Sequence, residues 1–415
     1  MNYIEILGQK AQDAKKSLAT ASTGKKNQIL KRIADKLLEK QSDILAANEK
    51  DIANARDNGI SETMVDRLKL TGERIAGIAD ACIQLTNLED PVGEVIEGST
   101  RPNGMKITKV RVPMGVVGII YESRPNVTVD AASLCIKSGN AAILRGGKEA
   151  ICSNKVLMDT MREAVAECGF PEDIVQLVED TSREVSTQMM QANGFIDVLI
   201  PRGGAGLIQA VVKNATLPVI ETGTGNCHIY IDETADLEMG VSITDNGKTQ
   251  RPSVCNALET CLVHKNVAGK FLPMLKKKLD EHHVEIRGCE RTAAILGECV
   301  IPATQQDYAT EFLDYKIAVK VVDSVEEAID HIGRYSTGHS ECIVTESYAN
   351  AHKFQQEVDS ACVYVNCSTR FTDGGEFGMG AEIGISTQKL HARGPMGLKE
   401  LTTMKYLICG EGQIR

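Results

Sequence analysis

The 415-residue chain contains no tryptophan, and aromatic side chains make up only 4% of it. Its core must therefore be built mainly from alanine, valine, isoleucine and leucine. The chain also lacks a long hydrophobic run, because its most apolar stretch, 116–121, is far shorter than the roughly 18 residues of a membrane span. The first residues carry scattered charges in place of a basic stretch followed by an apolar one, so no secretory signal is predicted. We expect a cytoplasmic protein with no membrane partner.

Positive charge is in short supply. The chain has 46 lysine and arginine residues against 56 aspartate and glutamate residues, which gives a net charge of −10. This surplus of acidic groups argues against nucleic acid as a partner, although small anions can still bind to local basic groups. Apolar residues at 42% and charged residues at 25% are ordinary for a globular protein and exclude a disordered chain.

Paired cysteine and histidine motifs are missing as well. The 13 cysteines are odd in number and spread from Cys82 to Cys409, so they do not suit a disulfide framework and are expected to be reduced thiols. The sequence has no CxxC or HExxH pattern, and the pairs 255 with 261 and 362 with 367 are too widely spaced to suggest zinc. We therefore predict no metal site.

Helices are predicted for residues 1 to about 95, where Ile29, Ile33 and Leu37 recur at helical spacing. After a turn at 101–104, apolar and polar side chains alternate over 105–112, which predicts a half-buried strand in a hairpin outside the main sheet.

From Pro113 onward the pattern changes to strands that alternate with helices. The predicted strands lie at 116–121, 141–144, 174–178, 196–200 and 219–220 in a first set, and at 260–264, 293–296, 317–322, 342–345 and 362–366 in a second set. Strands separated by helices in this way form parallel sheets, which bind ligands beyond the carboxyl ends of their strands. The sequence thus predicts an α/β protein with two parallel-sheet domains, and a last strand, 401–409, that pairs with the early hairpin.

Two loops at predicted strand ends are candidates for binding phosphate. Gly203 and Gly204 open a helix, whose N-terminus suits a phosphate, although a plain tight turn is an equal alternative. The run Arg145-Gly146-Gly147-Lys148 offers a guanidinium fork and an ammonium charge, although its composition favours an ordinary basic turn.

Cys255 is a candidate nucleophile. It follows Arg251, Pro252 and Ser253, which mark a loop, and a helix is predicted to start after it. A thiol near a helix N-terminus and an arginine has its thiolate favoured. Among 13 cysteines this argument alone gives a low prior for catalysis.

Several segments resemble the aldehyde dehydrogenase superfamily in order and spacing. They are the strand 112–120 with Asn126 after it, 138–145, the Gly-rich turn 219–225 with Glu221, the loop around Cys255, and Glu311-Phe-Leu. Longer strings resemble one branch, the gamma-glutamyl phosphate reductase family, and these are 121–128, 248–253, 336–341, 380–387 and 391–398.

The resemblance implies a fold and its division. The fold would be aldehyde dehydrogenase-like, with two Rossmann-like parallel-sheet domains and a small β oligomerisation element. The implied parts are an NADP-binding domain (1–97 and 113–225), oligomerisation strands (98–112 and 400–415), a catalytic domain (226–365) and a returning segment with substrate and cofactor loops (366–399). A homodimer or homotetramer is expected, since exposed strand edges also invite pairing.

The resemblance also implies a reaction, the second step of proline biosynthesis. L-Glutamyl 5-phosphate would be reduced with NADPH to L-glutamate 5-semialdehyde and phosphate. Cys255 would form a thioester, and the Asn126 amide would stabilise the oxyanion together with the Cys255 backbone N–H. A turn residue after Pro125 is the alternative for Asn126. Glu221 matches a water-activating residue of hydrolytic relatives, and here it would either tune Cys255 or be structural.

Cofactor and substrate residues follow from the same resemblance. Arg145 matches the cofactor lysine of the family, and Lys148 stands where NAD-preferring relatives often have a glutamate. These two cations suit the 2′-phosphate of NADPH. Glu311 would hold the nicotinamide ribose. The arginines within or beside the matching strings are candidates for binding the substrate's phosphate and carboxylate, with pairing to acidic residues as the alternative: Arg124, Arg251, Arg370 and Arg393. His339 would orient phosphate or be structural.

Two rival interpretations remain. A hydrolytic aldehyde dehydrogenase would need water at Cys255 and an active Glu221. A non-catalytic binding protein of the same fold would have an unreactive Cys255. If the chain is the reductase, a separate glutamate 5-kinase must supply the acyl phosphate, and we expect a transient contact with it because acyl phosphates are labile.

Overall fold

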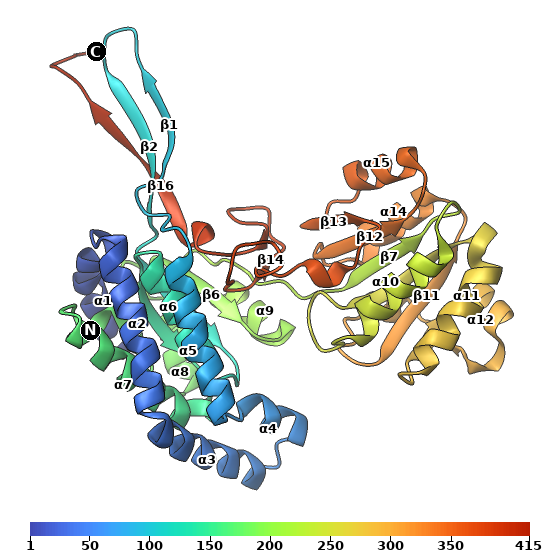
Figure 1. Ribbon diagram of the computed structural model, residues 1–415, viewed down its shortest axis with the longest axis horizontal. Coiled ribbons are helices and arrows are strands. Elements are labelled where there is room, and N and C mark those ends of the chain that lie inside the picture. The colour runs from blue at the N-terminus through green and yellow to red at the C-terminus, as the bar shows by residue number, and fades with distance from the viewer. The chain divides into compact units, whose positions relative to one another are not determined.

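The computed structural model describes residues 1–415, except for the side chain of Thr63. The chain forms two compact units (Figure 1). Unit 1 comprises 1–222, 378–384 and 396–415, and unit 2 comprises 223–377 and 385–395. Each unit contains a parallel sheet with helices, so the predicted fold class is confirmed.

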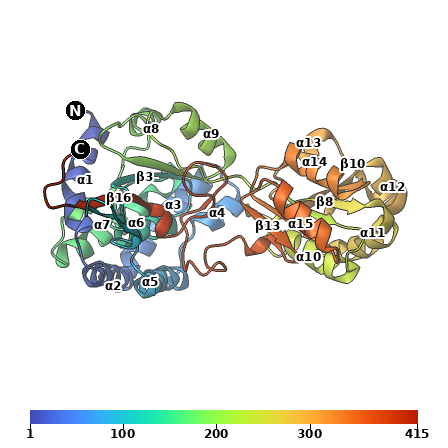
Figure 2. The ribbon, with the colours of Figure 1, turned by 90° about the horizontal axis from the view of Figure 1, so that it is seen from above.

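Unit 1 begins with five helices, as predicted for this part of the sequence. They are α1 (Tyr3–Ala19), α2 (Thr23–Glu39), α3 (Gln41–Asp57), α4 (Glu62–Leu68) and α5 (Gly72–Asn87). The side chains of Asn2, Ser22 and Thr71 cap the first turns of α1, α2 and α5 by accepting backbone N–H groups. The predicted apolar stripe of α2 is buried, and this helix lies beside α5 (Figure 2).

The sheet of unit 1 has the order β5-β4-β3-β6, and its strands are parallel. Its strands are β3 (Val116–Tyr121), β4 (Ala141–Arg145), β5 (Val175–Leu177) and β6 (Val198–Arg202). The helices that follow these strands are α6 (Asn126–Lys137), α7 (Ile151–Glu167), α8 (Arg183–Met190) and α9 (Ala205–Asn214). Each residue of the central strand β3 is buried. The carboxyl ends of β3, β4 and β6 therefore open onto the loops that carry Glu122, Arg145 and Gly203.

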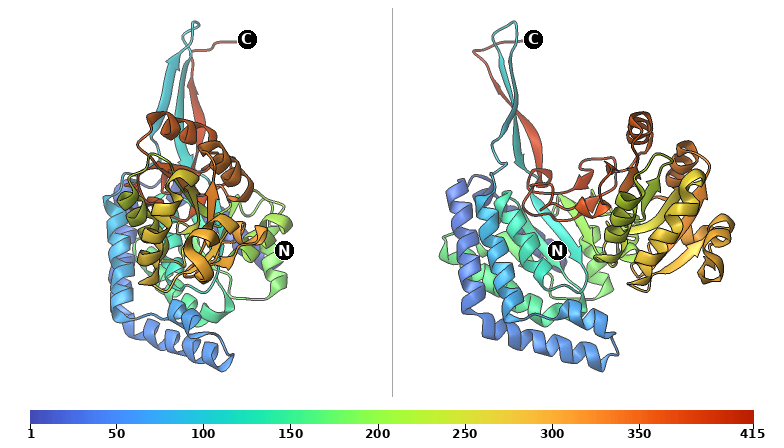
Figure 3. Two further views of the ribbon diagram at one scale, coloured as in Figure 1. Left: turned by 90° about the vertical axis from the view of Figure 1, so that its right-hand side faces the viewer. Right: turned by 45° about the vertical axis from the view of Figure 1, so that its right-hand side comes forward.

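A three-stranded antiparallel sheet also belongs to unit 1 and projects from it (Figure 3). Its order is β1 (Val95–Thr100), β2 (Lys106–Pro113) and β16 (Thr402–Cys409). Thr402 lies opposite Pro113 and Cys409 opposite Lys106, which confirms the predicted pairing of the last strand with the early hairpin. Every residue of β1 is exposed, as are the last seven residues of β16.

Unit 2 is built on a seven-stranded parallel sheet of order β10-β9-β11-β8-β7-β12-β13. Its strands are β7 (Cys227–Ile231), β8 (Leu258–His264), β9 (Glu285–Gly288), β10 (Ile301–Pro302), β11 (Lys316–Val322), β12 (Ser340–Val344) and β13 (Cys362–Val365). Its helices are α10 (Leu237–Thr249), α11 (Lys265–Asp280), α12 (Glu290–Leu296), α13 (Gln305–Tyr308), α14 (Val325–Tyr335) and α15 (Tyr348–Glu357), and β14 (Ile385–Ser386) pairs with β15 (Gly394–Pro395). Strands β7, β8 and β12 are buried throughout, so the centre of this sheet is its core.

Some predicted details of the secondary structure were wrong or incomplete. Residues 293–296 form the end of helix α12 and not a strand, because a four-residue apolar run does not distinguish the two and the helical turn starts earlier, at Glu290. Strands β7 and β9 were not predicted. The strand expected at 219–220 is reduced to a single bridge between Val219 and Leu199.

Within the part of the chain that the structure describes, no helix has both the length and the apolar character needed to cross a membrane.

Candidate active site

Cys255 lies in a turn between the end of α10 and the start of β8, and it is partly exposed. The helix expected after it is absent: α10 already ends at Thr249, and the residues after Ala257 are the β-prone run that forms β8. A helix N-terminus therefore does not favour its thiolate, and that part of the sequence argument was wrong. Any electrostatic help for the sulfur must come from neighbouring side chains.

The backbone of Cys255 is packed tightly against the segment before β7. A methyl group placed on Gly225 would lie 1.4 Å from the Cys255 carbonyl oxygen, so only glycine leaves room for this contact. The Cys227 thiol donates a hydrogen bond to the same carbonyl oxygen over 3.2 Å. The sequence indicated a Gly-rich turn at 219–225 but no role for Cys227. The Gly225 packing and the Cys227 hydrogen bond together fix the main chain of Cys255.

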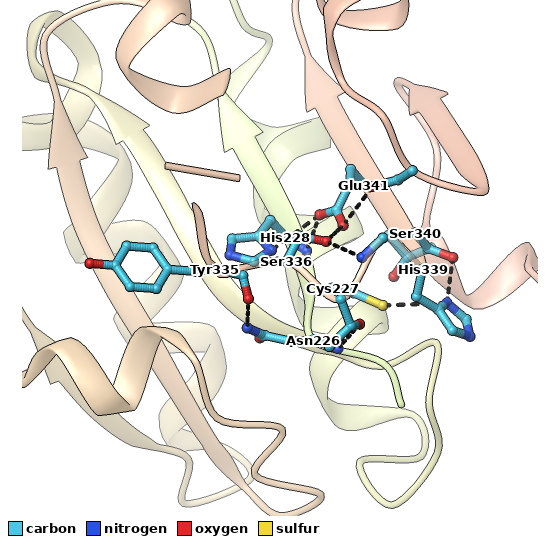
Figure 4. A network of polar contacts seen from close by, with 12 residues as sticks. Asn226, Cys227, His228, Tyr335, Ser336, His339, Ser340 and Glu341 are labelled. Carbon is cyan, nitrogen blue, oxygen red and sulfur yellow. Dashed lines mark hydrogen bonds and ion pairs between the residues drawn. The ribbon is translucent and has the colours of Figure 1, made fainter. Parts of the chain in front are cut away.

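Residues of the string 336–341 form a network of polar contacts with the segment that contains Asn226 and Cys227 (Figure 4). The Thr337 hydroxyl donates to the Thr224 carbonyl and accepts from the Asn226 N–H at 3.0 Å. The Asn226 side chain donates to the carbonyl oxygens of Tyr308 and Tyr335. Residues 224–227 are thus held by hydrogen bonds along their length.

His339 belongs to this buried network and is fully inaccessible to solvent. Its Nδ1 lies 2.8 Å from the Ser340 hydroxyl and 3.7 Å from the Cys227 sulfur. Burial lowers the pKa of His339 to about 4, so the imidazole is neutral near pH 7. A neutral, enclosed ring supports the structural alternative for His339 over phosphate binding.

Arg370 is held against the loop that carries the nucleophile. Its guanidinium donates to the Gln250 side chain at 2.9 Å and to the Asn256 side-chain oxygen. Burial and the charge of Arg251 lower the pKa of Arg370, whereas the charge of Cys255 acts in the opposite direction. Arg251 itself is exposed and precedes Cys255 in the same loop. A cation beside this loop suits an anionic substrate.

The other two arginines have different surroundings. Arg393 donates to the Asp359 carboxylate at 2.8 Å and to its backbone carbonyl at 2.7 Å, which matches the alternative of pairing with an acidic residue. Arg124 is an exposed residue of unit 1, in the loop between β3 and α6.

Glu311 is connected to the nucleophile through Gly225. Its Oε1 accepts a 2.8 Å hydrogen bond from the N–H of Gly225, the residue that packs on the Cys255 carbonyl. Burial raises the pKa of Glu311, and the positive charge of Lys248 opposes this rise. Unit 2 therefore brings Cys255, Glu311 and Arg370 into one neighbourhood.

A buried ion pair next to this neighbourhood was missed. Lys248 and Glu259 are both fully buried, and Lys248 Nζ lies 2.6 Å from Glu259 Oε2. Burial raises the pKa of Glu259 to about 7 and lowers the pKa of Lys248. The signal was present in the sequence, since Glu259 interrupts the apolar run of β8.

Unit 1 carries Asn126 and Glu221. Asn126 is the first residue of α6, and its side-chain amide donates a 2.8 Å hydrogen bond to Asp130 Oδ2 one turn later. Glu221 is partly buried and follows the bridge between Val219 and Leu199. Its role stays open between the alternatives given above.

Strand β4 ends at Arg145, a partly buried cation. Arg145 donates to the Thr181 carbonyl at 2.7 Å, while its Nε is buried without a hydrogen-bond partner. Burial lowers the pKa of Arg145. Lys148 is exposed three residues later. A methyl group on Gly146 would clash with the Asn154 side chain, so the chain turns here in close contact with its neighbours.

Two helix N-termini in unit 1 differ in their availability. The first N–H groups of α7 donate to the buried carboxylate of Asp51, from Cys152 at 3.1 Å and from Ser153 at 2.7 Å. Helix α9 begins as predicted, directly after Gly204, and the Gly204 N–H donates at 2.9 Å to Glu122, which is exposed. An anion can therefore reach the N-terminus of α9 by displacing a surface carboxylate.

Comparisons with known proteins agree with this architecture. The aldehyde dehydrogenase family model matches residues 3–297. An acetylating aldehyde dehydrogenase from Geobacillus thermoglucosidasius has a TM-score of 0.70 at 17% identity over 99% of this chain and 97% of its own, which is a likeness of fold. A gamma-glutamyl phosphate reductase from Clostridium perfringens is 58% identical over 414 residues and 100% of both chains. The crystal structure of a gamma-glutamyl phosphate reductase from Thermotoga maritima has a TM-score of 0.98 at 52% identity over 100% of both chains. The chain belongs to the aldehyde dehydrogenase family and, within it, to the gamma-glutamyl phosphate reductases.

Proposed function

We propose that the chain reduces L-glutamyl 5-phosphate to L-glutamate 5-semialdehyde and phosphate with NADPH, as a step of proline biosynthesis. The observation that carries the proposal is the setting of Cys255, whose main chain is fixed by Gly225 and Cys227 while the Arg370 guanidinium is held by Gln250 and Asn256 of the same loop. An acyl phosphate needs a nucleophile for its carbon and cations for its leaving group. Both are assembled in unit 2.

The Cys255 sulfur forms a bond to the acyl carbon, and the bond from that carbon to the phosphate oxygen breaks. The arginines accept the negative charge of the departing phosphate, and a thioester remains on Cys255. NADPH, when bound, would supply a hydride to the acyl carbon. The carbon–sulfur bond then breaks, its electron pair stays on sulfur, and the aldehyde is released with the Cys255 thiolate restored. The Asn126 amide and the Cys255 N–H donate hydrogen bonds to the oxyanion of each tetrahedral state.

The residues predicted to hold the cofactor have surroundings that suit this role. Arg145 has a buried Nε with no partner and Lys148 adds an exposed charge nearby, so this loop fits a phosphate-bearing dinucleotide. The N–H of Gly204, next to Gly203 at the start of α9, is a further donor for phosphate. Glu311 would accept hydrogen bonds from the nicotinamide ribose. In this proposal residues 1–97 and 113–225 bind NADP, 226–365 are catalytic, 366–399 carry substrate and cofactor loops, and 98–112 with 400–415 form the oligomer.

We infer a homo-oligomer formed through the projecting sheet. Val95, Met404, Tyr406 and Ile408 expose large apolar side chains on β1 and β16, and strand edges pair readily. A transient contact with the kinase that supplies the acyl phosphate would protect this labile substrate. Sedimentation of the full chain, compared with a M404K/Y406K/I408K variant, tests the first point, and a monomeric wild type would overturn it.

The experiment that tests the reaction runs it in reverse. L-Glutamate 5-semialdehyde and NADP are supplied with and without phosphate, and Cys255→Ala is the control for the nucleophile. Reduction of NADP that requires phosphate and disappears in the variant supports the proposal. Reduction without phosphate means that water takes the thioester, with Glu221 as the base. No activity in either protein favours the binding-protein interpretation.

A further inference from the structure

The buried pair of Lys248 and Glu259 has no assigned role in the chemistry above. Both side chains have zero exposure, and the pair is closed by a 2.6 Å contact and by a 2.9 Å hydrogen bond from Lys248 Nζ to the Leu258 carbonyl. Burying two charges is costly, and apolar residues of the same volume often give equal or greater stability. Stability alone therefore does not account for this pair.

The second carboxylate oxygen of Glu259 is bonded to the backbone of a neighbouring loop. Glu259 Oε1 accepts a 3.1 Å hydrogen bond from the backbone N–H of Leu313. Leu313 has a φ of 54°, in the left-handed region that non-glycine residues rarely adopt, and its side chain is 42% exposed. Packing of the side chain thus does little to hold this conformation, and the hydrogen bond that the Leu313 N–H donates to the buried carboxylate holds the backbone.

Leu313 lies two residues after Glu311, so the hydrogen bond fixes the loop that carries Glu311. The Glu311 carboxylate is itself anchored on the Gly225 N–H at 2.8 Å. Lys248 balances the charge of Glu259 and leaves its Oε1 directed at Leu313. Two hydrogen bonds therefore hold the loop. The Glu311 carboxylate accepts one from the Gly225 N–H, and the Leu313 N–H donates the other to Glu259.

We propose that Lys248 and Glu259 are a positioning pair that holds the 311–313 loop in the conformation required to bind the nicotinamide ribose of the cofactor. The inference rests on the proposed function, because it assigns Glu311 to that ribose. Losing the pair should raise the KM for NADPH, while the reaction at saturating cofactor should proceed at nearly the normal rate.

Two double variants isolate the hydrogen bond. K248M/E259Q removes both charges but keeps an acceptor oxygen for Leu313, whereas K248M/E259L removes the acceptor as well. We expect the KM for NADPH of K248M/E259L to rise about tenfold, as for loss of one hydrogen bond, with kcat and the substrate KM within about threefold of wild type. K248M/E259Q should stay within about threefold of wild type in all three constants.

A double-mutant cycle with Glu311 distinguishes a positioning role from a general loss of structure. In a Glu311→Ala background, K248M/E259L should add no further rise in the KM for NADPH, since its effect acts through Glu311. If a double variant does not fold, Glu259→Asp keeps the charge pair but withdraws the carboxylate by one methylene, and the same rise in KM is expected. Equal NADPH constants for wild type, K248M/E259L and Glu259→Asp would overturn the inference. An inactive wild type would instead overturn the proposed function.

Discussion

The side-chain amide of Asn126 donates a 2.8 Å hydrogen bond to the carboxylate of Asp130, one turn further along α6. Burial raises the pKa of Asp130, while Asn126 and the charge of Arg202 oppose this rise. One N–H of the amide is thereby fixed, and the other is left with a defined direction. If Asn126 stabilises the oxyanion, Asp130 sets the direction of its donor.

Asp130→Ala should therefore lower kcat about tenfold, less than the loss expected from removing the donor itself. Asp130→Asn is the matched control, because its carboxamide oxygen can accept the same hydrogen bond. We expect it to keep most of the activity. Steady-state kinetics with saturating NADPH measures both, and an unchanged kcat in Asp130→Ala would show that Asn126 needs no such support.

Gly225 offers a test of the packing behind the nucleophile. In Gly225→Ala the new methyl group meets the Cys255 carbonyl oxygen at 1.4 Å, and the obstacle is backbone that cannot rotate away. We expect activity to fall at least about 100-fold, as for loss of a positioned oxyanion donor, and stability to fall by about 1–3 kcal/mol. Reverse-reaction rates and thermal unfolding provide the readouts.

Gly269→Ala is the control for that substitution, since nothing lies within 4 Å of its added methyl group in helix α11. It should leave activity unchanged and stabilise the protein slightly. Gly225→Ala with normal activity would mean that the main chain of Cys255 tolerates displacement.

If a cofactor phosphate binds at the start of α9, as proposed, the Glu122 carboxylate competes with it. Its carboxylate accepts the Gly204 N–H that we assign to a cofactor phosphate. Glu122→Gln should tighten NADPH binding about two- to fivefold, because a charge near a helix N-terminus is worth a fraction of a kcal/mol. Fluorescence titration of NADPH measures the change. Glu184→Gln, in the first turn of α8, should have no effect. Weaker binding in Glu122→Gln would mean that the carboxylate contacts the cofactor.

The sequence predicted the alternation of strands and helices well, because buried parallel strands are short apolar runs with helices between them. Strand β7 was missed because a Gly-rich turn runs directly into it, so that Gly223 to His228 looked like one loop. Strand β9 was missed because Glu285 and Arg287 make it polar, and these two side chains pair with each other at the sheet surface. Pattern alone does not show which charges are satisfied.

The candidate site was predictable only in part, for a related reason. Cys255 lies in a segment that resembles the family and Arg370 was a candidate because it lies beside the matching strings, so both were found. Glu259 interrupts the apolar run of β8, which hints at a buried charge, but the sequence does not show that its partner is Lys248, 11 positions earlier. The role of Asp130 depends on a helix register that starts at Asn126. These contacts arise from tertiary packing, which spacing in a single sequence does not encode.

His339 makes the stability of the protein depend on pH in a definite direction. Its pKa is about 4 in the folded chain, below its ordinary value of 6.5, because burial disfavours the charged ring. Between these two values the unfolded chain binds a proton that the folded chain does not. The contribution of His339 is therefore complete above about pH 6.5 and is lost as the pH falls toward about 4.

His339→Asn removes the titrating group while keeping a polar atom near Ser340. Between about pH 7 and about pH 4.5, wild type should lose about 2 kcal/mol more of its free energy of unfolding than His339→Asn. Urea unfolding at the two pH values measures the difference, and the carboxylates that titrate in both proteins cancel from it. Equal losses would mean that the ring is protonated in the folded protein, and a cationic His339 would again be a candidate for binding phosphate.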